Sequence, residues 1–226
     1  MLILLCLTFV TGSVDAASYL GLGRVFTANM TGNVAMIGFA ASGSPGLPLL
    51  HSAVALAAFV AGAVVAGRAA RRADGRAIWP LPVTGATAVA ALLLTLVLLT
   101  WVGHATPPRP GVLAALLALA MGAQGAATRK LGVADLPTTV VTSTLTGLAA
   151  DSVLAGGASV RWKRRAAALV ALMSGALSGG LLVQVSPALG LMPAIVVLVT
   201  VTTLTASARL HEPVPLLEVA PAATAS

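Results

Sequence analysis

Residues 81–102 read LPVTGATAVAALLLTLVLLTWV, a run that contains no charged side chain. At about 1.5 Å per residue, a helix of this length covers the hydrocarbon core of a bilayer, which is about 30 Å thick. Three further runs of this kind occupy residues 49–67, 166–185 and 188–208. They lack the alternation of barrel strands, and helices are then the only structure that satisfies the backbone in lipid. The sequence therefore predicts an all-α integral membrane protein.

The composition of the whole chain supports this class. Of 226 residues, 58% are hydrophobic and 8% are charged, whereas a soluble domain carries about 25% charged residues. The net charge of +7 comes from cations in short loops between apolar runs. We interpret these cations as topology signals and predict no binding of nucleic acid.

Two clusters of basic residues set the predicted orientation, one after the run at 49–67 and one before the run at 166–185. Their members are Arg68, Arg71, Arg72, Arg76, Arg161, Lys163, Arg164 and Arg165. The positive-inside rule places both clusters in the cytoplasm, so an even number of crossings separates them. The simplest solution has about six net crossings and both termini in the cytoplasm. Residues 209–226, rich in proline and small residues, are predicted to form a disordered tail.

Two regions, 2–42 and 111–157, are too long for one span and contain polar interruptions. We expect each to make one full crossing, then to return to the middle of the membrane, and then to leave it through a half-helix. The expected half-helices are 31–42 and 144–157. A broken helix without re-entry is the alternative.

The two halves of the chain share an order of small and polar residues. Thr8, Gly12 and Ala16 match Ala118, Gly122 and Ala126; TANMTG at 27–32 matches TSTLTG at 142–147; and Ala58, Gly62 and Ala66 match Ala171, Gly175 and Gly179. The stripes of small residues indicate close helix packing within one chain, with a dimer face as the alternative. Three crossings per half predict two inverted repeats, 1–102 and 103–208, unless the matches arise by chance from the biased composition.

The polar stretches before the half-helices carry the candidate substrate-binding residues. These are Asp15, Thr27, Asn29, Thr31, Gly32, Asn33, Thr142, Thr144, Thr146 and Gly147. A helix N-terminus offers unpaired N–H groups and a positive dipole end, so two facing N-termini would suit an anion or a carboxylate. Alternatively, the threonines and asparagines only satisfy a broken backbone.

Asp15 is the only acid in the first long region. A carboxylate at membrane depth is costly and marks a functional site by default. We expect Asp15 to carry a coupling proton or to bind a cation, or else to pair with Arg24 or a threonine hydroxyl. An intramembrane enzyme would need converging catalytic groups, and Asp15 and Asp151 have no His or Cys beside them. We predict no enzyme, no cofactor and no metal site.

The residues GSVDAASYL at 12–20, followed by VFTANMTGN at 25–33, resemble the YoaK-like family of bacterial membrane proteins of unknown function. The resemblance implies a multi-pass protein of the bacterial inner membrane and supplies no reaction or solute. The second half has no acid that matches Asp15, because the aligned residue is Gly125 with Gln124 beside it. A proton or cation role is therefore expected in the first half alone.

The sequence favours a secondary transporter or channel for a small solute, with an anion preferred, bound at the midplane between the half-helix starts. A non-transporting assembly or signalling protein is the alternative, and it predicts threonines and asparagines packed without a cavity. The expected partners are the lipid bilayer and the solute. Whether the chain forms a homo-oligomer is left open. Trp79, Trp101 and Trp162 fall at span ends, where aromatic belts form.

Overall fold

A computed structural model describes residues 1–72, 81–104, 106–107, 109–129, 141–158 and 160–210. Within these ranges the chain is helical and contains no strand. Its elements are α1 (Leu2–Gly21), α2 (Met30–Ala41), α3 (Leu49–Arg72), α4 (Leu81–Trp101), α5 (Pro110–Arg129), α6 (Val141–Ala150), η1 (Val153–Ala155), α7 (Trp162–Val185), η2 (Pro187–Leu191) and α8 (Met192–Leu210). The all-α prediction is confirmed.

Six of these helices are long and apolar enough to cross a membrane: α1, α3, α4, α5, α7 and α8. This number agrees with the predicted crossings for the part of the chain that the structure describes. The two remaining α-helices are shorter, with 12 residues in α2 and 10 in α6. They correspond to the expected half-helices, although α6 begins and ends earlier than predicted and a 3-10 turn follows it.

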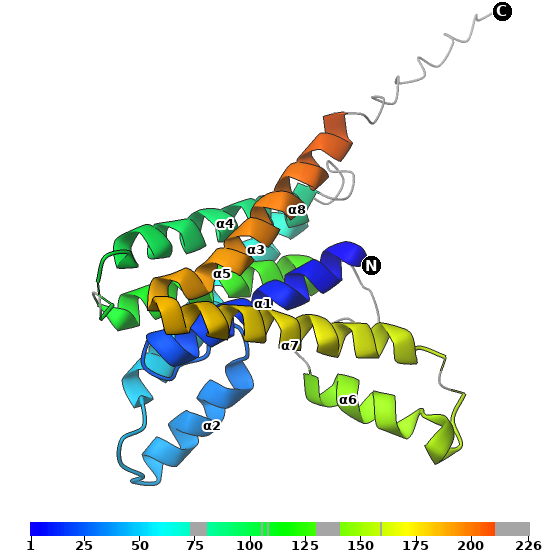
Figure 1. The fold of residues 1–226 in the computed structure, drawn as a ribbon, viewed down its shortest axis with the longest axis horizontal. Coiled ribbons are helices and arrows are strands. Elements are labelled where there is room, and N and C mark those ends of the chain that lie inside the picture. The colour runs from blue at the N-terminus through cyan, green and yellow to red at the C-terminus, as the bar shows by residue number, and fades with distance from the viewer. Residues whose placement is uncertain (73–80, 105, 108, 130–140, 159, 211–226) are drawn as a thin grey trace, which may run out of the picture.

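The core of the molecule is formed by α1, α4, α5 and α8, whose leucines and valines bury one another. Helix α7 lies against α1, and helix α3 lies against α5. Helices α7 and α3 therefore flank the core. Figure 1 shows α2 and α6 on the same side of this bundle, with their later ends pointing apart. Helix α2 contacts α3, and α6 contacts α7.

Glycines make both flanking contacts close, because a Cβ at these positions would overlap a backbone carbonyl oxygen of the opposite helix. The contacts are Gly12 with Leu172, Gly175 with Phe9, Gly62 with Leu119, and Gly122 with Phe59. The first two join α1 to α7, and the last two join α3 to α5. The stripes of small residues therefore pack within one chain, as their spacing indicates.

The interruption after α1 is a reversal of the chain. Gly23 adopts the left-handed conformation (φ 89°), and the N–H of Arg24 donates to the carbonyl of Tyr19 at 3.1 Å. This is the helix ending that a glycine permits. Residues 25–29 then return alongside α1, so that α2 begins next to Asp15. Since Asp15 lies six residues before the end of α1, α2 begins roughly 9 Å inside that end.

The corresponding connection in the second half, residues 130–140, lies outside the described residues, as do Lys130, Trp79 and the predicted tail from 211 on. Trp101 differs from its expected role. Its side chain is fully buried against Gly21 and does not belong to an aromatic belt. Trp162, at the start of α7, is half exposed.

Candidate functional site

The carboxylate of Asp15 binds the backbone that leads into α2. Its Oδ1 accepts hydrogen bonds from the N–H groups of Thr27 (2.9 Å) and Ala28 (2.8 Å). Its Oδ2 accepts from the N–H of Asn29 (3.1 Å) and from Asn29 Nδ2 (2.6 Å). Asp15 is 6% exposed, so these four donors replace water. We call Asp15 together with residues 27–29 the Asp15 latch.

The Asp15 latch gives hydrogen-bond partners both to the backbone N–H groups of residues 27–29 and to the buried carboxylate. Backbone N–H groups that enter the interior of a membrane protein need a partner, and residues 27–29 precede the helix that would otherwise provide one. A buried charge also needs hydrogen bonds, because its transfer from water is costly. Asp15 and residues 27–29 satisfy each other. The partners of Asp15 are therefore the backbone and Asn29, and not Arg24 or a threonine hydroxyl.

Asn33 holds the same loop from the first turn of α2. Its Nδ2 donates to the carbonyl of Phe26 at 2.6 Å, and its Oδ1 accepts from the N–H of Phe26 at 3.0 Å. The Asn33 side chain is fully buried. Gly32 lies against the Phe26 ring, where a Cβ would overlap ring atoms. Thr27 Oγ1 donates to Ser18 Oγ at 3.2 Å.

We expect Asn33→Leu to lower the free energy of unfolding by about 2 kcal/mol or more, because both partly buried backbone groups of Phe26 would lose their hydrogen-bond partner. Thr31→Val is the matched control two residues earlier. The Thr31 side chain is exposed, so its replacement is expected to change stability by less than about 0.5 kcal/mol. Thermal unfolding of the detergent-purified variants measures both. Equal stability of the two variants would contradict the role assigned to Asn33.

A cavity of about 280 Å³ borders the latch, between α1 and α7. Asp15 and Asn29 reach it, and Leu172 and Ala176 of α7 form part of its apolar lining. The rings of Tyr19 and Phe26 also line it and stack with their centroids 4.7 Å apart. A water molecule takes up about 30 Å³, so the cavity has room for a solute of a few heavy atoms between walls that are almost entirely apolar.

The second polar stretch lies in a different setting. Thr142 and Thr146 are exposed and Thr144 is buried. The carbonyl of Gly147 accepts a hydrogen bond from Arg165 Nη1 of α7. The same nitrogen forms an ion pair with Asp151 Oδ2 at 2.5 Å.

The structure thus brings together one half of the predicted site residues. Asp15, Thr27, Asn29, Gly32 and Asn33 surround one loop, whereas Thr31 is exposed on the surface of α2. The stretch at 142–147 lies apart, because α6 packs on α7 and makes no contact with α2. The N–H groups at 27–29 are not open to a solute anion, since the carboxylate of Asp15 already occupies them.

Sequence reasoning missed Ser18, Tyr19 and Phe26. A signal for two of them was present, because residues three and four positions after Asp15 share its helix face. Phe26 had no such signal, as its place depends on the reversal at Gly23. Within the described ranges, no group of three or more His, Cys, Asp or Glu residues is placed to hold a metal ion.

Comparison with known proteins gives a family and no activity. A family model described as "Protein of unknown function (DUF1275)" matches residues 3–204. The UPF0700 transmembrane protein YoaK of Bacillus subtilis (strain 168) is 39% identical over 151 residues, which are 67% of this chain. The match covers 65% of that relative's length. No solved structure matches the chain.

Proposed function

Since the chain belongs to the DUF1275 family of proteins of unknown function, we propose its role from its own residues: it is a secondary transporter or channel for a small solute, with Asp15 as the coupling or gating group. The Asp15 latch carries this proposal. It places an ionisable side chain inside a membrane-spanning helix, bonds it to the start of a shorter helix, and sets it beside a cavity. Ionisable residues at membrane depth mark proton relays and ion pathways in transporters.

Protonation of Asp15 changes how firmly the start of α2 is held against α1. An ionised carboxylate only accepts hydrogen bonds, and here it accepts four. A neutral acid carries a hydroxyl that donates, so one of its oxygens no longer suits the N–H groups of the loop. The start of α2 is then released. The core stays intact, because α2 packs on α3 and Asn33 is its one buried residue.

The contacts between helices support two inverted repeats, 1–102 and 103–208. Helix α1 packs on α7 as α5 packs on α3, and α8 packs on α1 as α4 packs on α5. Gly12 and Gly122 match in sequence and occupy equivalent places in these contacts. Inverted repeats with interrupted helices are a recurring design of secondary transporters, with the solute site at the midplane.

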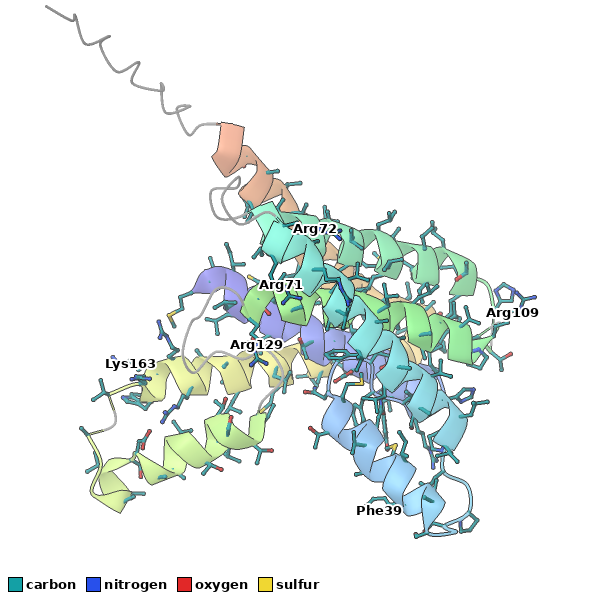
Figure 2. All side chains as sticks on the ribbon, turned by 180° about the vertical axis from the view of Figure 1, so that it is seen from behind. Phe39, Arg71, Arg72, Arg109, Arg129 and Lys163 are labelled. Atoms are coloured by element: carbon teal, nitrogen blue, oxygen red, sulfur yellow. The ribbon has the colours of Figure 1, made fainter. Side chains whose placement is uncertain are left out.

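We place this multi-pass protein in the bacterial inner membrane with both termini in the cytoplasm. Arg71, Arg72, Arg129 and Lys163 lie toward one side of the molecule and Arg109 lies on the other, as Figure 2 shows. This separation along the helix axes supports the positive-inside orientation.

For the solute, the site favours a small neutral or cationic molecule over the anion that the sequence suggested. Asp15 is one of the residues that line the cavity, and a second negative charge in the same low-dielectric space would be repelled. A non-transporting structural role would account for the buried, fully bonded Asn33. It gives no reason for a cavity at Asp15 and Asn29, and we therefore rank it second.

A thermal-stability screen tests the proposal. Small cations, neutral metabolites, carboxylates and inorganic anions are added to the purified protein, because a ligand of the folded state raises its stability with concentration. We expect a saturable shift from one neutral or cationic class, lost in Asp15→Asn and retained in Thr31→Val. A hit is followed by uptake into proteoliposomes. A shift that Asp15→Asn leaves unchanged, or a shift from anions alone, would contradict the assigned site.

A further inference from the structure

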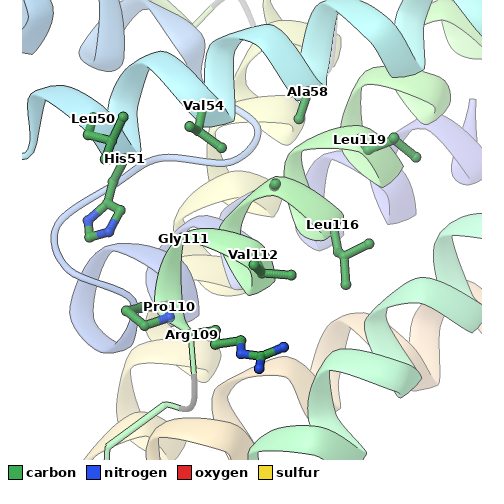
Figure 3. A pocket seen from close by; sticks show the side chains of 11 residues that line it. Leu50, His51, Val54, Ala58, Arg109, Pro110, Gly111, Val112, Leu116 and Leu119 are labelled. Atoms are coloured by element: carbon green, nitrogen blue, oxygen red, sulfur yellow. The ribbon is translucent and has the colours of Figure 1, made fainter.

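A larger cavity of about 520 Å³ lies in a groove between the first turns of α3 and α5 (Figure 3). Its walls are apolar side chains from both helices: Leu50, Val54 and Ala58 from α3, and Val112, Leu116 and Leu119 from α5. The volume is within the range of about 300–1,000 Å³ that is typical of ligand sites. The cavity is separate from the Asp15 latch, since none of the latch residues lines it.

One end of this groove is basic. Figure 3 shows His51 and Arg109 near Pro110 and Gly111, with Ala58 and Leu119 farther along the groove. Arg109 is exposed and forms no ion pair with a described residue. It also precedes α5 directly, and its carbonyl accepts hydrogen bonds from the N–H groups of Val112 and Leu113. The positive end of the α5 dipole therefore adds to the charge of Arg109.

The positive-inside rule does not explain the position of Arg109. The basic residues Arg71 and Arg72 lie at the opposite end of α3, where the positive-inside rule accounts for them. Arg109 lies at the other membrane face, and its backbone adopts the left-handed conformation (φ 55°). That conformation is uncommon for a residue other than glycine.

We propose that this groove binds an anionic lipid, with an acyl chain between α3 and α5 and a phosphate headgroup at Arg109. The apolar walls need an occupant with a long apolar part, which a free inorganic anion does not have. The cationic end selects among lipids, because a phosphate accepts charge-assisted hydrogen bonds from a guanidinium. His51 lies beside Gly111, which is two residues after Arg109 in the chain.

Binding of two lipids with identical chains tests the proposal. Dioleoyl phosphatidylglycerol is anionic, and dioleoyl phosphatidylcholine carries no net charge. Native mass spectrometry of the purified full chain counts bound lipid and gives apparent affinities. We expect saturable binding of phosphatidylglycerol, weakened about tenfold or more in Arg109→Gln, since a hydrogen bond to a charged group is lost. Ala115→Phe fills the groove and is expected to weaken binding of this lipid as well.

Arg72→Gln is the matched control at the far end of α3, and it is expected to bind phosphatidylglycerol like the parent. A further arm adds inorganic phosphate, which is expected neither to bind measurably nor to compete at millimolar concentration. Equal affinity for the two lipids, or an Arg109→Gln variant that binds like the parent, would overturn the proposal. So would competition by inorganic phosphate, which would assign the groove to a soluble anion. Thermal unfolding without lipid checks that each variant is folded.

Discussion

Asp15→Asn is expected to release residues 27–29 from α1 while the helix bundle stays folded. A carboxamide has the shape of a carboxylate but one acceptor oxygen, so at most two of the four hydrogen bonds of Asp15 can persist. The NH₂ group of the new asparagine would lie opposite N–H donors of residues 27–29, with which it cannot form hydrogen bonds. Each lost bond to a charged acceptor is worth about 1.5–3 kcal/mol. We therefore expect hydrogen exchange at residues 27–29 to accelerate about tenfold or more.

Hydrogen-exchange mass spectrometry resolves this effect along the chain. Asp151→Asn is the matched control, because Asp151 is largely exposed and pairs with Arg165 in the second half. It should leave exchange at residues 27–29 unchanged. The amides of α5 report on the bundle and should stay protected in both variants. If Asp15→Asn exchanges like the parent at residues 27–29, Asp15 does not hold the start of α2.

Gly62→Ala is expected to destabilise the protein by about 2 kcal/mol or more, as overpacking of a close contact does. The added Cβ would overlap the backbone carbonyl of Leu119. This overlap cannot be relieved by a rotamer change, because the carbonyl belongs to the backbone of α5. Gly67→Ala on the same helix is the control. A Cβ there meets nothing within 4 Å, so alanine should be neutral or stabilise α3 by up to about 1 kcal/mol.

The same substitution in the second half tests the repeat. Gly175 contacts Phe9 of α1 as Gly62 contacts Leu119 of α5, so Gly175→Ala should lose stability by a similar amount. Thermal unfolding of the three purified variants gives the comparison. A Gly62→Ala variant as stable as Gly67→Ala would show that α3 and α5 are not in backbone contact. A large difference between Gly62→Ala and Gly175→Ala would count against equivalent crossings in the two halves.

The spans could be predicted from sequence because hydropathy and length determine them locally. The runs at 49–67 and 166–185 became α3 and α7, and the polar interruption at 27–33 correctly marked the start of α2. Burial of Trp101 could not be predicted in this way. A tryptophan at a span end suits an aromatic belt equally well, and the small Gly21 that accommodates it is eighty residues away in the chain.

The partners of Asp15 were beyond sequence reasoning for a related reason. They are backbone N–H groups twelve to fourteen residues later, and they reach the carboxylate only because the chain reverses at Gly23. The sequence correctly identified α2 and its polar start, but it treated the N–H groups as open. It also expected α2 and α6 to face each other. Each half-helix packs instead on the helix that follows it, which a one-dimensional pattern of polar residues cannot reveal.

Whether Asp15 controls the position of α2 is tested most directly by a distance measurement in liposomes. Spin labels are placed at Phe39 on α2 and Val65 on α3, both exposed, in a Cys6→Ser background. If the Asp15 latch holds α2, double electron–electron resonance will give one narrow distance distribution for the parent. Asp15→Asn will then broaden it or add a second distance. Identical distributions in the two proteins would contradict a gating role for Asp15.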